Sequence, residues 1–350
     1  MVNAQLFTHM KQRSIYLDNI CCVLILHMIY TCHISYSCGG YKPLPIAMIG
    51  TTLSFFMSWF FFKGGMMHKK STIKELFKKS VKRLLLPFVI FLFIGFVLDC
   101  VIKFTNIENL TIPSFIKAEI SNLISTCIIG PTGASWFLLS LFVARIAFNF
   151  LYTKVHPLLI TATFACASYG IFLMINHGWT FGLHMPGHNT FLNIPTFYMG
   201  NMCHGLAVYS LGYYIKDRQF NKAIFLFAFI LFVLKYFIPA SIDFRANNPS
   251  GVNFMLAVIY GMSVCIVINN IFKRFANKRI PVITHIGVNS MVYYLIHYPV
   301  MYTTISLFWR PFEDSELWLR FIVLSFIVTI SLIFADLLFR CKKLRFIIGG

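Results

Sequence analysis

The sequence predicts an all-α fold, a polytopic membrane helix bundle of about ten transmembrane helices with both termini cytoplasmic. Three observations indicate this class. Of the 350 residues, 58% are hydrophobic and only 12% are charged, against about 25% charged in a typical soluble domain. The mean hydropathy is +0.74. The apolar residues also fall into segments long enough to cross a bilayer, which takes about 20 residues per helix.

Ten apolar segments follow one another and, with their loops, use the whole chain. The sequence therefore predicts one membrane domain over residues 1–350, without a separate soluble domain. The segments lie roughly at 16–35, 44–62, 84–102, 136–152, 158–176, 194–215, 223–240, 252–272, 287–307 and 321–339.

The positive charge of the chain follows its loops. The net charge is +19, from 30 Lys and Arg against 11 Asp and Glu. With the N-terminus placed inside, the inner loops and tails hold 22 of the Lys and Arg residues and the outer loops hold six. This asymmetry is the positive-inside pattern of membrane topology. Membrane topology therefore explains the positive net charge, and no nucleic-acid partner is predicted.

The inner loop at 63–83 predicts an amphipathic helix. Thr72 and Glu75 have the spacing of a capping box. Apolar residues then follow at helical spacing, and lysines occupy the opposite face: Ile73, Leu76, Phe77 and Val81 against Lys74, Lys78, Lys79 and Lys82. Such a helix lies on a membrane surface. Its cations either bind the phosphates of a nucleotide cofactor, or fix topology and bind anionic lipid.

The outer loop at 177–193 combines histidines and aromatic residues, including Trp179. His184 and His188 have a metal-like spacing, but Pro186 and Gly187 break the helix that would align them. The ten cysteines lie mostly within apolar segments and form no zinc-finger spacing. No metal is therefore predicted, and the loop is either a sugar-binding surface or a plain interfacial loop.

Ionisable groups inside apolar segments are costly and often functional. Asp18, His27 and His33 share the first segment, and the other such groups are Arg145, His204, Lys235, His285, His297 and Asp336. In an ideal α-helix His27 and His33 point about 120° apart, and Asp18 lies about 22 Å from His33 along the axis. Either histidine suits general-base chemistry, or is a buried neutral side chain bonded to a backbone carbonyl.

Five segments carry a shared pattern in order along the chain. They are RSIYLDNICCVLILHMIYTCH at 13–33, FFMSWFFFKGGMMHKK at 55–70 with KKSVKRLLLPF at 78–88, WFLLSLFVARI at 136–146, GLAVYSLGYYIKD at 205–217 and NSMVYYLIHYPV at 289–300. Together they resemble the acyltransferase-3 family of membrane O-acyltransferases. The family usually has Arg or Lys three residues after the aspartate, where this chain has Cys21.

The resemblance implies a bacterial enzyme of the cytoplasmic (inner) membrane. Such an enzyme moves an acyl group, usually acetyl, from cytosolic acetyl-CoA to a hydroxyl of a cell-surface or exported glycan. Acetyl-CoA is then a co-substrate, and no bound cofactor is expected.

The resemblance also assigns roles to residues of this chain. It makes His33 the catalytic histidine, with His27 as the second choice and Asp18 as the aspartate of the same motif. It places five residues near the donor: Arg13, Lys79, Lys82, Arg83 and Trp136. Beside the resemblance, we expect Tyr293, Tyr294 and His297 to orient the acceptor or the base, and Trp179 of the aromatic outer loop to contact the acceptor. Trp136 equally suits an interfacial aromatic belt, and His297 with its tyrosines equally suits core packing.

Two other classes remain open from the sequence. A transporter or glycan flippase would use intramembrane His and Asp to relay protons or bind substrate. The internal repeats or matching broken spans common in transporters are not evident here. The second class is a non-catalytic relative, which the cysteine at position 21 favours.

Overall fold

The computed structural model describes residues 14–43, 53, 55–106, 111–126, 135–176, 194–218, 221–238, 240, 252–308 and 315–349. This part of the chain is helical throughout and contains no strand, which confirms the all-α expectation. By length and composition, five of its helices could cross a membrane: Ile15–Ser37, Ile73–Thr105, Pro157–Met174, Met255–Phe275 and Leu317–Leu338. The chain is therefore a helical membrane protein, while the expected ten spans remain a prediction.

The helices follow the predicted apolar segments closely. In the first half of the chain they are α2 (Ile15–Leu26), η1 (His27–Ile34), α3 (Ser35–Ser37), α5 (Phe56–Met66), α6 (Ile73–Ser80), η2 (Val81–Leu85), α7 (Leu86–Asn106), α8 (Ile112–Thr126) and α9 (Trp136–Leu151). In the second half they are α10 (Pro157–Asn176), α11 (Ile194–Ile215), α12 (Lys222–Phe237), α13 (Val252–Phe275), α14 (Pro281–Val288), α15 (Ser290–Phe308), α16 (Leu317–Leu338) and η4 (Arg345–Ile348).

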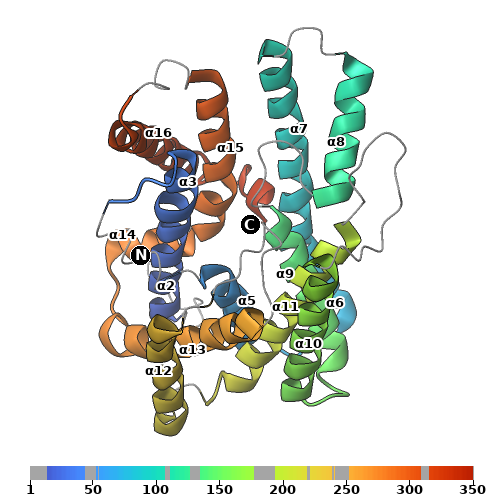
Figure 1. The fold of residues 1–350 in the computed structure, drawn as a ribbon, viewed down its shortest axis with the longest axis vertical. Helices are drawn as coiled ribbons and strands as arrows, with labels where there is room; N and C mark the ends of the chain where they lie inside the picture. The colour runs from blue at the N-terminus through green and yellow to red at the C-terminus, as the bar shows by residue number, and fades with distance from the viewer. Residues whose placement is uncertain are drawn as a thin grey trace, which may run out of the picture.

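Two elements differ from the predicted segments. Helix α8 occupies part of the outer stretch 103–135, for which no helix was predicted, and it lies beside α7 (Figure 1). The ninth apolar segment, predicted at 287–307, corresponds to α15, and the separate short helix α14 precedes it in a stretch for which no helix was predicted. In both places a helix lies outside the segment that hydropathy alone marks.

Helices α2 and α5 form the centre of the bundle. Helix α2 packs against α13, α14 and α15, and α5 packs against α9, α11 and α13. The α5 side chains Trp59, Phe61 and Phe62 are fully buried. In a membrane, helices associate through close packing rather than through transfer out of water. The α5–α11 pair shows this, since a Cβ at Gly65 would lie 1.8 Å from the backbone oxygen of Tyr209.

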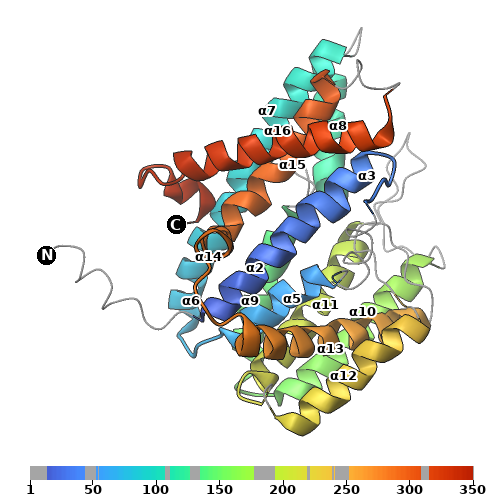
Figure 2. The ribbon, with the colours of Figure 1, turned by 90° about the vertical axis from the view of Figure 1, so that its left-hand side faces the viewer.

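The ends of several helices gather on one side of the bundle. Figure 2 shows that α2 begins, α6 lies and α16 ends on the same side, whereas α3 lies toward the opposite side. The side where α2 begins carries the cationic helix α6 and the cationic ends of α13 and α16. The loops on this side were predicted to be the inner ones. The arrangement agrees in geometry with the positive-inside assignment.

Candidate active site

Two histidines from distant parts of the sequence meet between η1 and α15. Nδ1 of His33 lies 2.7 Å from Nε2 of His297. Their rings are nearly parallel, with an interplanar angle of 4° and 4.9 Å between centroids. His297 is 1% exposed, whereas His33 is partly exposed. The predicted catalytic histidine and a predicted base-orienting residue are therefore direct partners.

The hydrogen bonds around this pair determine its tautomers. Nδ1 of His297 lies 3.0 Å from the backbone oxygen of Tyr293. Since a carbonyl oxygen only accepts, His297 Nδ1 carries the proton and donates it. In the neutral ring Nε2 of His297 then accepts, so Nδ1 of His33 donates to it. This leaves the lone pair of His33 on Nε2, the nitrogen that can accept a proton in general-base catalysis.

The first membrane helix changes its winding where it carries the histidines. Residues His27–Ile34 form a π-helix, which continues α2 without a break. Hydrogen bonds in a π-helix run from i to i+5, and such turns are frequent at functional sites. The 120° angle expected between His27 and His33 assumed a regular α-helix, and it stays a prediction for this differently wound turn. The wider turn sets the direction in which His33 leaves the helix.

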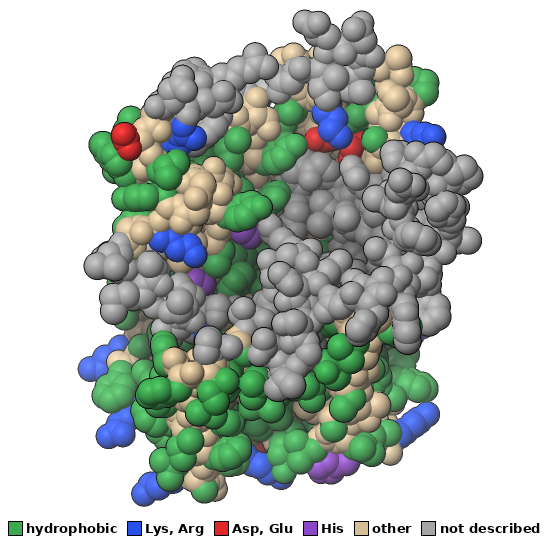
Figure 3. All heavy atoms as spheres, in the orientation of Figure 1, with side chains coloured by type: hydrophobic (Ala, Val, Ile, Leu, Met, Phe, Trp, Pro, Cys, Tyr) green, Lys and Arg blue, Asp and Glu red, His purple; other side chains and the backbone are tan. Residues whose placement is uncertain are grey.

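An aromatic layer surrounds the histidine pair. Tyr298 meets the His33 ring edge-on at 5.4 Å, and Tyr294 lies 6.3 Å from the His297 ring. Tyr294 in turn contacts Phe137 of α9 at 5.7 Å. Aromatic packing thus connects the pair to the start of α9, and Trp136 in that first turn is 6% exposed. Figure 3 shows a hollow in one face of the molecule with histidine and hydrophobic side chains inside it.

His27 has a different environment from His33. It is 5% exposed, its Nε2 lies 3.6 Å from Sγ of Cys32, and its ring meets Phe56 edge-on. Within the described part of the chain, no group hydrogen-bonds to its Nδ1. A base needs a partner that orients it. His33 has the imidazole of His297 as that partner, whereas His27 has only the thiol of Cys32, which hydrogen-bonds weakly.

Asp18 lies at the other end of the same helix from His33 and is buried, 3% exposed. Its backbone touches α14, because a Cβ at Gly287 would lie 1.8 Å from the Asp18 carbonyl oxygen. The next residue, Asn19, donates to the backbone oxygen of Ala276 and accepts from the hydroxyl of Thr284. The motif therefore joins α2 to the start of α14, and the structure does not bring Asp18 to the histidine pair.

A lysine reaches the position where the family pattern differs. Nζ of Lys63, on α5, lies 2.8 Å from Sγ of Cys21 and 5.5 Å from the ring centroid of Trp59. The structure thus places a lysine of a neighbouring helix at the position where the resemblance led us to expect a cation on the first helix. Sequence spacing could not reveal this, since 42 residues separate Lys63 from Cys21.

The predicted donor-binding cations lie on exposed helical surface. The Glu75 N–H donates to the Thr72 side chain at 3.4 Å, which confirms the predicted helix start. Lys79 of α6 and Lys82 and Arg83 of η2 are exposed. Leu76 is buried and Phe77 contacts Phe142 of α9, but Ile73 and Phe77 are half exposed, so the apolar face packs only partly on the bundle. The structure brings these cations together, apart from the histidine pair.

The segment before α6 is held by a residue that sequence reasoning missed. His68 is 6% exposed, and its Nδ1 lies 2.9 Å from the hydroxyl of Tyr209. Its ring lies within 6 Å of four aromatic rings, those of Phe148, Tyr152, Tyr209 and Tyr213. Burial, aided by the charges of Arg145 and Lys216, lowers the pKa of His68 to about 4. The sequence gave no sign that His68 is buried, because lysines follow it directly.

Other predicted polar groups join helices to one another. His285 Nε2 lies 2.8 Å from Asp336, which also pairs with Arg340, and His204 Nε2 lies 3.1 Å from the Ser58 hydroxyl. Asp99 was missed, although a carboxylate within an apolar segment was the available signal. It pairs with Lys103, which also binds Glu119 of α8.

Three predictions concern parts of the chain outside the described residues. They are the donor residue Arg13, the acceptor residue Trp179 and the whole outer loop 177–193, and they stay predictions. Among the described residues, no three metal-binding side chains lie close enough to hold an ion.

The comparison with known families addresses the class of the molecule. The fold is a helical membrane bundle, and His33 and His297 lie within hydrogen-bonding distance of each other between η1 and α15. The family model described as an acyltransferase domain matches residues 15–340. The chain belongs to the acyltransferase-3 family and is an acyltransferase. A search of curated proteins and a search of solved structures found no match.

Proposed function

We propose that the protein transfers an acyl group, in the simplest case acetyl, from cytosolic acetyl-CoA to a hydroxyl of a cell-surface or exported glycan. The observation that carries this proposal is the hydrogen bond between His33 and His297. Its direction makes His33 Nε2 a proton acceptor, and His297 holds the His33 ring in that tautomer. An acyl transfer to a hydroxyl requires such a base.

The reaction would proceed by proton transfer and thioester cleavage. His33 Nε2 takes the proton from the acceptor hydroxyl while the oxygen attacks the thioester carbonyl carbon. The carbon–sulfur bond then breaks, and the departing thiolate takes the proton from the imidazolium. While His33 is charged, its Nδ1–H bond to the neutral His297 is a charge-assisted hydrogen bond, which is stronger than a neutral one.

Exposed cations support a donor site on the inner side of the membrane. Coenzyme A carries several phosphate charges, and Lys79, Lys82 and Arg83 lie on adjacent turns of α6 and η2. Guanidinium and ammonium groups of this kind bind phosphates. We infer a chain inserted in the cytoplasmic membrane with both termini inside, so that these cations face the donor pool.

The test uses purified protein in liposomes with radiolabelled acetyl-CoA and a pool of cell-surface glycan. We expect label on the glycan, and a loss of about 10²- to 10⁴-fold in rate for His33→Ala. His27→Ala should retain most of the rate, since the partner of His27 is the weakly hydrogen-bonding thiol of Cys32. Equal losses in both variants would contradict the assignment of the base. Glycan movement without consumption of acetyl-CoA would contradict acyl transfer and favour a flippase.

A further inference from the structure

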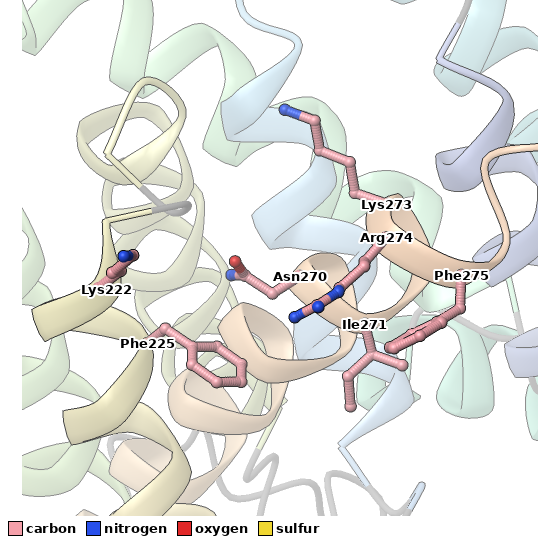
Figure 4. A pocket seen from close by; sticks show the side chains of 7 residues that line it. All are labelled: Lys222, Phe225, Asn270, Ile271, Lys273, Arg274 and Phe275. Carbon is pink, nitrogen blue, oxygen red and sulfur yellow. The ribbon is translucent and has the colours of Figure 1, made fainter.

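A cavity of about 480 Å³ lies between the start of α12 and the end of α13. Its lining combines three cations and three apolar side chains: Lys222, Lys273 and Arg274, and Phe225, Ile271 and Phe275. Figure 4 shows Arg274 extending from α13 toward α12, where Lys222 begins the helix. Nothing in the proposed acyl transfer uses this cavity. It also lies across the bundle from α6 (Figure 1).

The charges of the cavity select an anion. No acidic side chain is among the residues that line it. Lys222 is the first residue of α12, where Asn221 accepts hydrogen bonds from Ala223 N and Ile224 N. The positive end of the helix dipole therefore adds to the three side-chain charges. Arg274 lies over the ring of Phe275, with 5.4 Å to the centroid, which restrains its planar guanidinium group. Such a set binds phosphate groups well.

The apolar part of the lining selects a ligand with hydrocarbon chains. Ile271 is 41% exposed and Phe275 is 73% exposed. The row of apolar residues continues beyond the cavity along α12, where Leu226, Phe227 and Ile230 are 59%, 66% and 56% exposed. In a membrane helix these surfaces face lipid tails. A soluble phosphate ester would leave them without a partner, whereas the tails of a phospholipid would cover them.

We propose that this cavity binds an anionic membrane phospholipid. Its phosphate lies between Lys222 and Arg274, with Lys273 at the edge of the cavity, and its acyl chains run along Phe225 and the outer face of α12. The cavity joins two helices that pack against each other near the inner surface. A bound lipid would therefore hold the start of α12 against the end of α13. The cavity is predicted to lie on the inner side, where the cytoplasmic leaflet carries the anionic lipids that attract cationic segments.

Native mass spectrometry of the full chain in neutral detergent tests the proposal, with dioleoyl phosphatidylglycerol as the probe. We expect one tightly bound phosphatidylglycerol on the wild type. The variant Lys222→Gln/Lys273→Gln/Arg274→Gln should lose it, with an affinity at least tenfold lower. All three side chains are exposed, so the changes should leave the fold intact.

The control variant is Lys154→Gln/Lys342→Gln/Lys343→Gln, which removes the same charge from exposed inner positions. It should bind phosphatidylglycerol as the wild type does, and dioleoyl phosphatidylcholine should bind neither protein tightly. An equal loss in both variants would overturn the proposal, since general charge would then explain binding. Glycerol 3-phosphate competing as strongly as the lipid would also overturn it, because the apolar surface would then contribute nothing.

Discussion

His33 Nδ1 and His297 Nε2 lie 2.7 Å apart, although 264 residues separate them in the sequence. The contact joins η1 of the first membrane helix to α15 near the end of the chain. Because the Tyr293 carbonyl accepts from His297 Nδ1, the two rings have one internally consistent proton arrangement in the neutral state. Four predictions follow, one from this pair and three from other contacts between helices.

Replacing His297 with alanine should lower kcat by about 10- to 100-fold without raising the KM for acetyl-CoA. The substitution leaves the donor cations untouched but frees His33 to adopt the other tautomer. His297→Gln, which can still accept from His33 Nδ1, should recover part of the loss. Steady-state kinetics in liposomes with pH profiles of kcat measure this effect. A merely structural role would give the same profile for both variants and a lower protein yield.

Replacing Lys63 with methionine should reduce acyl transfer by at least about tenfold, since it removes the only cation that the described structure places at Cys21. Lys63→Arg should retain most of the activity, because it keeps the charge near Cys21 and Trp59. Lys117→Met on the exposed surface of α8 is the matched control. Equal activity of Lys63→Met and wild type would show that the cation has no part in the reaction.

Replacing Gly287 with alanine should destabilise the protein by about 2–4 kcal/mol or prevent folding. The new Cβ would lie 1.8 Å from the Asp18 carbonyl oxygen, so α14 would have to move away from α2. Gly170→Ala is the control, since nothing lies within 4 Å of its Cβ position. Thermal unfolding in detergent, followed by size-exclusion chromatography, compares the two. Similar midpoints would contradict the close helix contact.

Acidification should destabilise the protein through His68. Burial lowers the pKa of its folded form to about 4 from 6.5. Between pH 6.5 and pH 4 the histidine is therefore protonated in the unfolded chain and neutral in the folded chain. The stability from neutral His68 is complete above pH 6.5, and it is lost progressively as the pH falls toward 4.

The variant His68→Gln isolates this effect. Its stability should fall less than that of the wild type between pH 6.5 and 4, by a difference of up to about 3 kcal/mol. Unfolding midpoints at several pH values measure it, with His156→Gln as an exposed control. Parallel curves for wild type and His68→Gln would contradict the buried neutral histidine.

The sequence alone determined the class of the protein and most of its helices. Hydropathy is a local property, so apolar length located helices such as α10 and α16 to within a few residues. Thr72 and Glu75 likewise predicted the start of α6, because a helix cap depends on neighbours three residues apart. The order of the motifs also predicted the family, which the match over residues 15–340 confirmed.

Tertiary structure alone decided which polar groups meet. The π-helical turn at His27–Ile34 replaces the regular α-helix that was expected there, and no residue in the sequence marks such a turn. Lys63 beside Cys21, and His68 among four aromatic rings, depend on how α2, α5, α9 and α11 pack. Local periodicity describes one helix at a time, whereas a site between helices is set by their crossing geometry. The sequence therefore supplied His33 and His297 as candidates, and only the packing of η1 against α15 made them a pair.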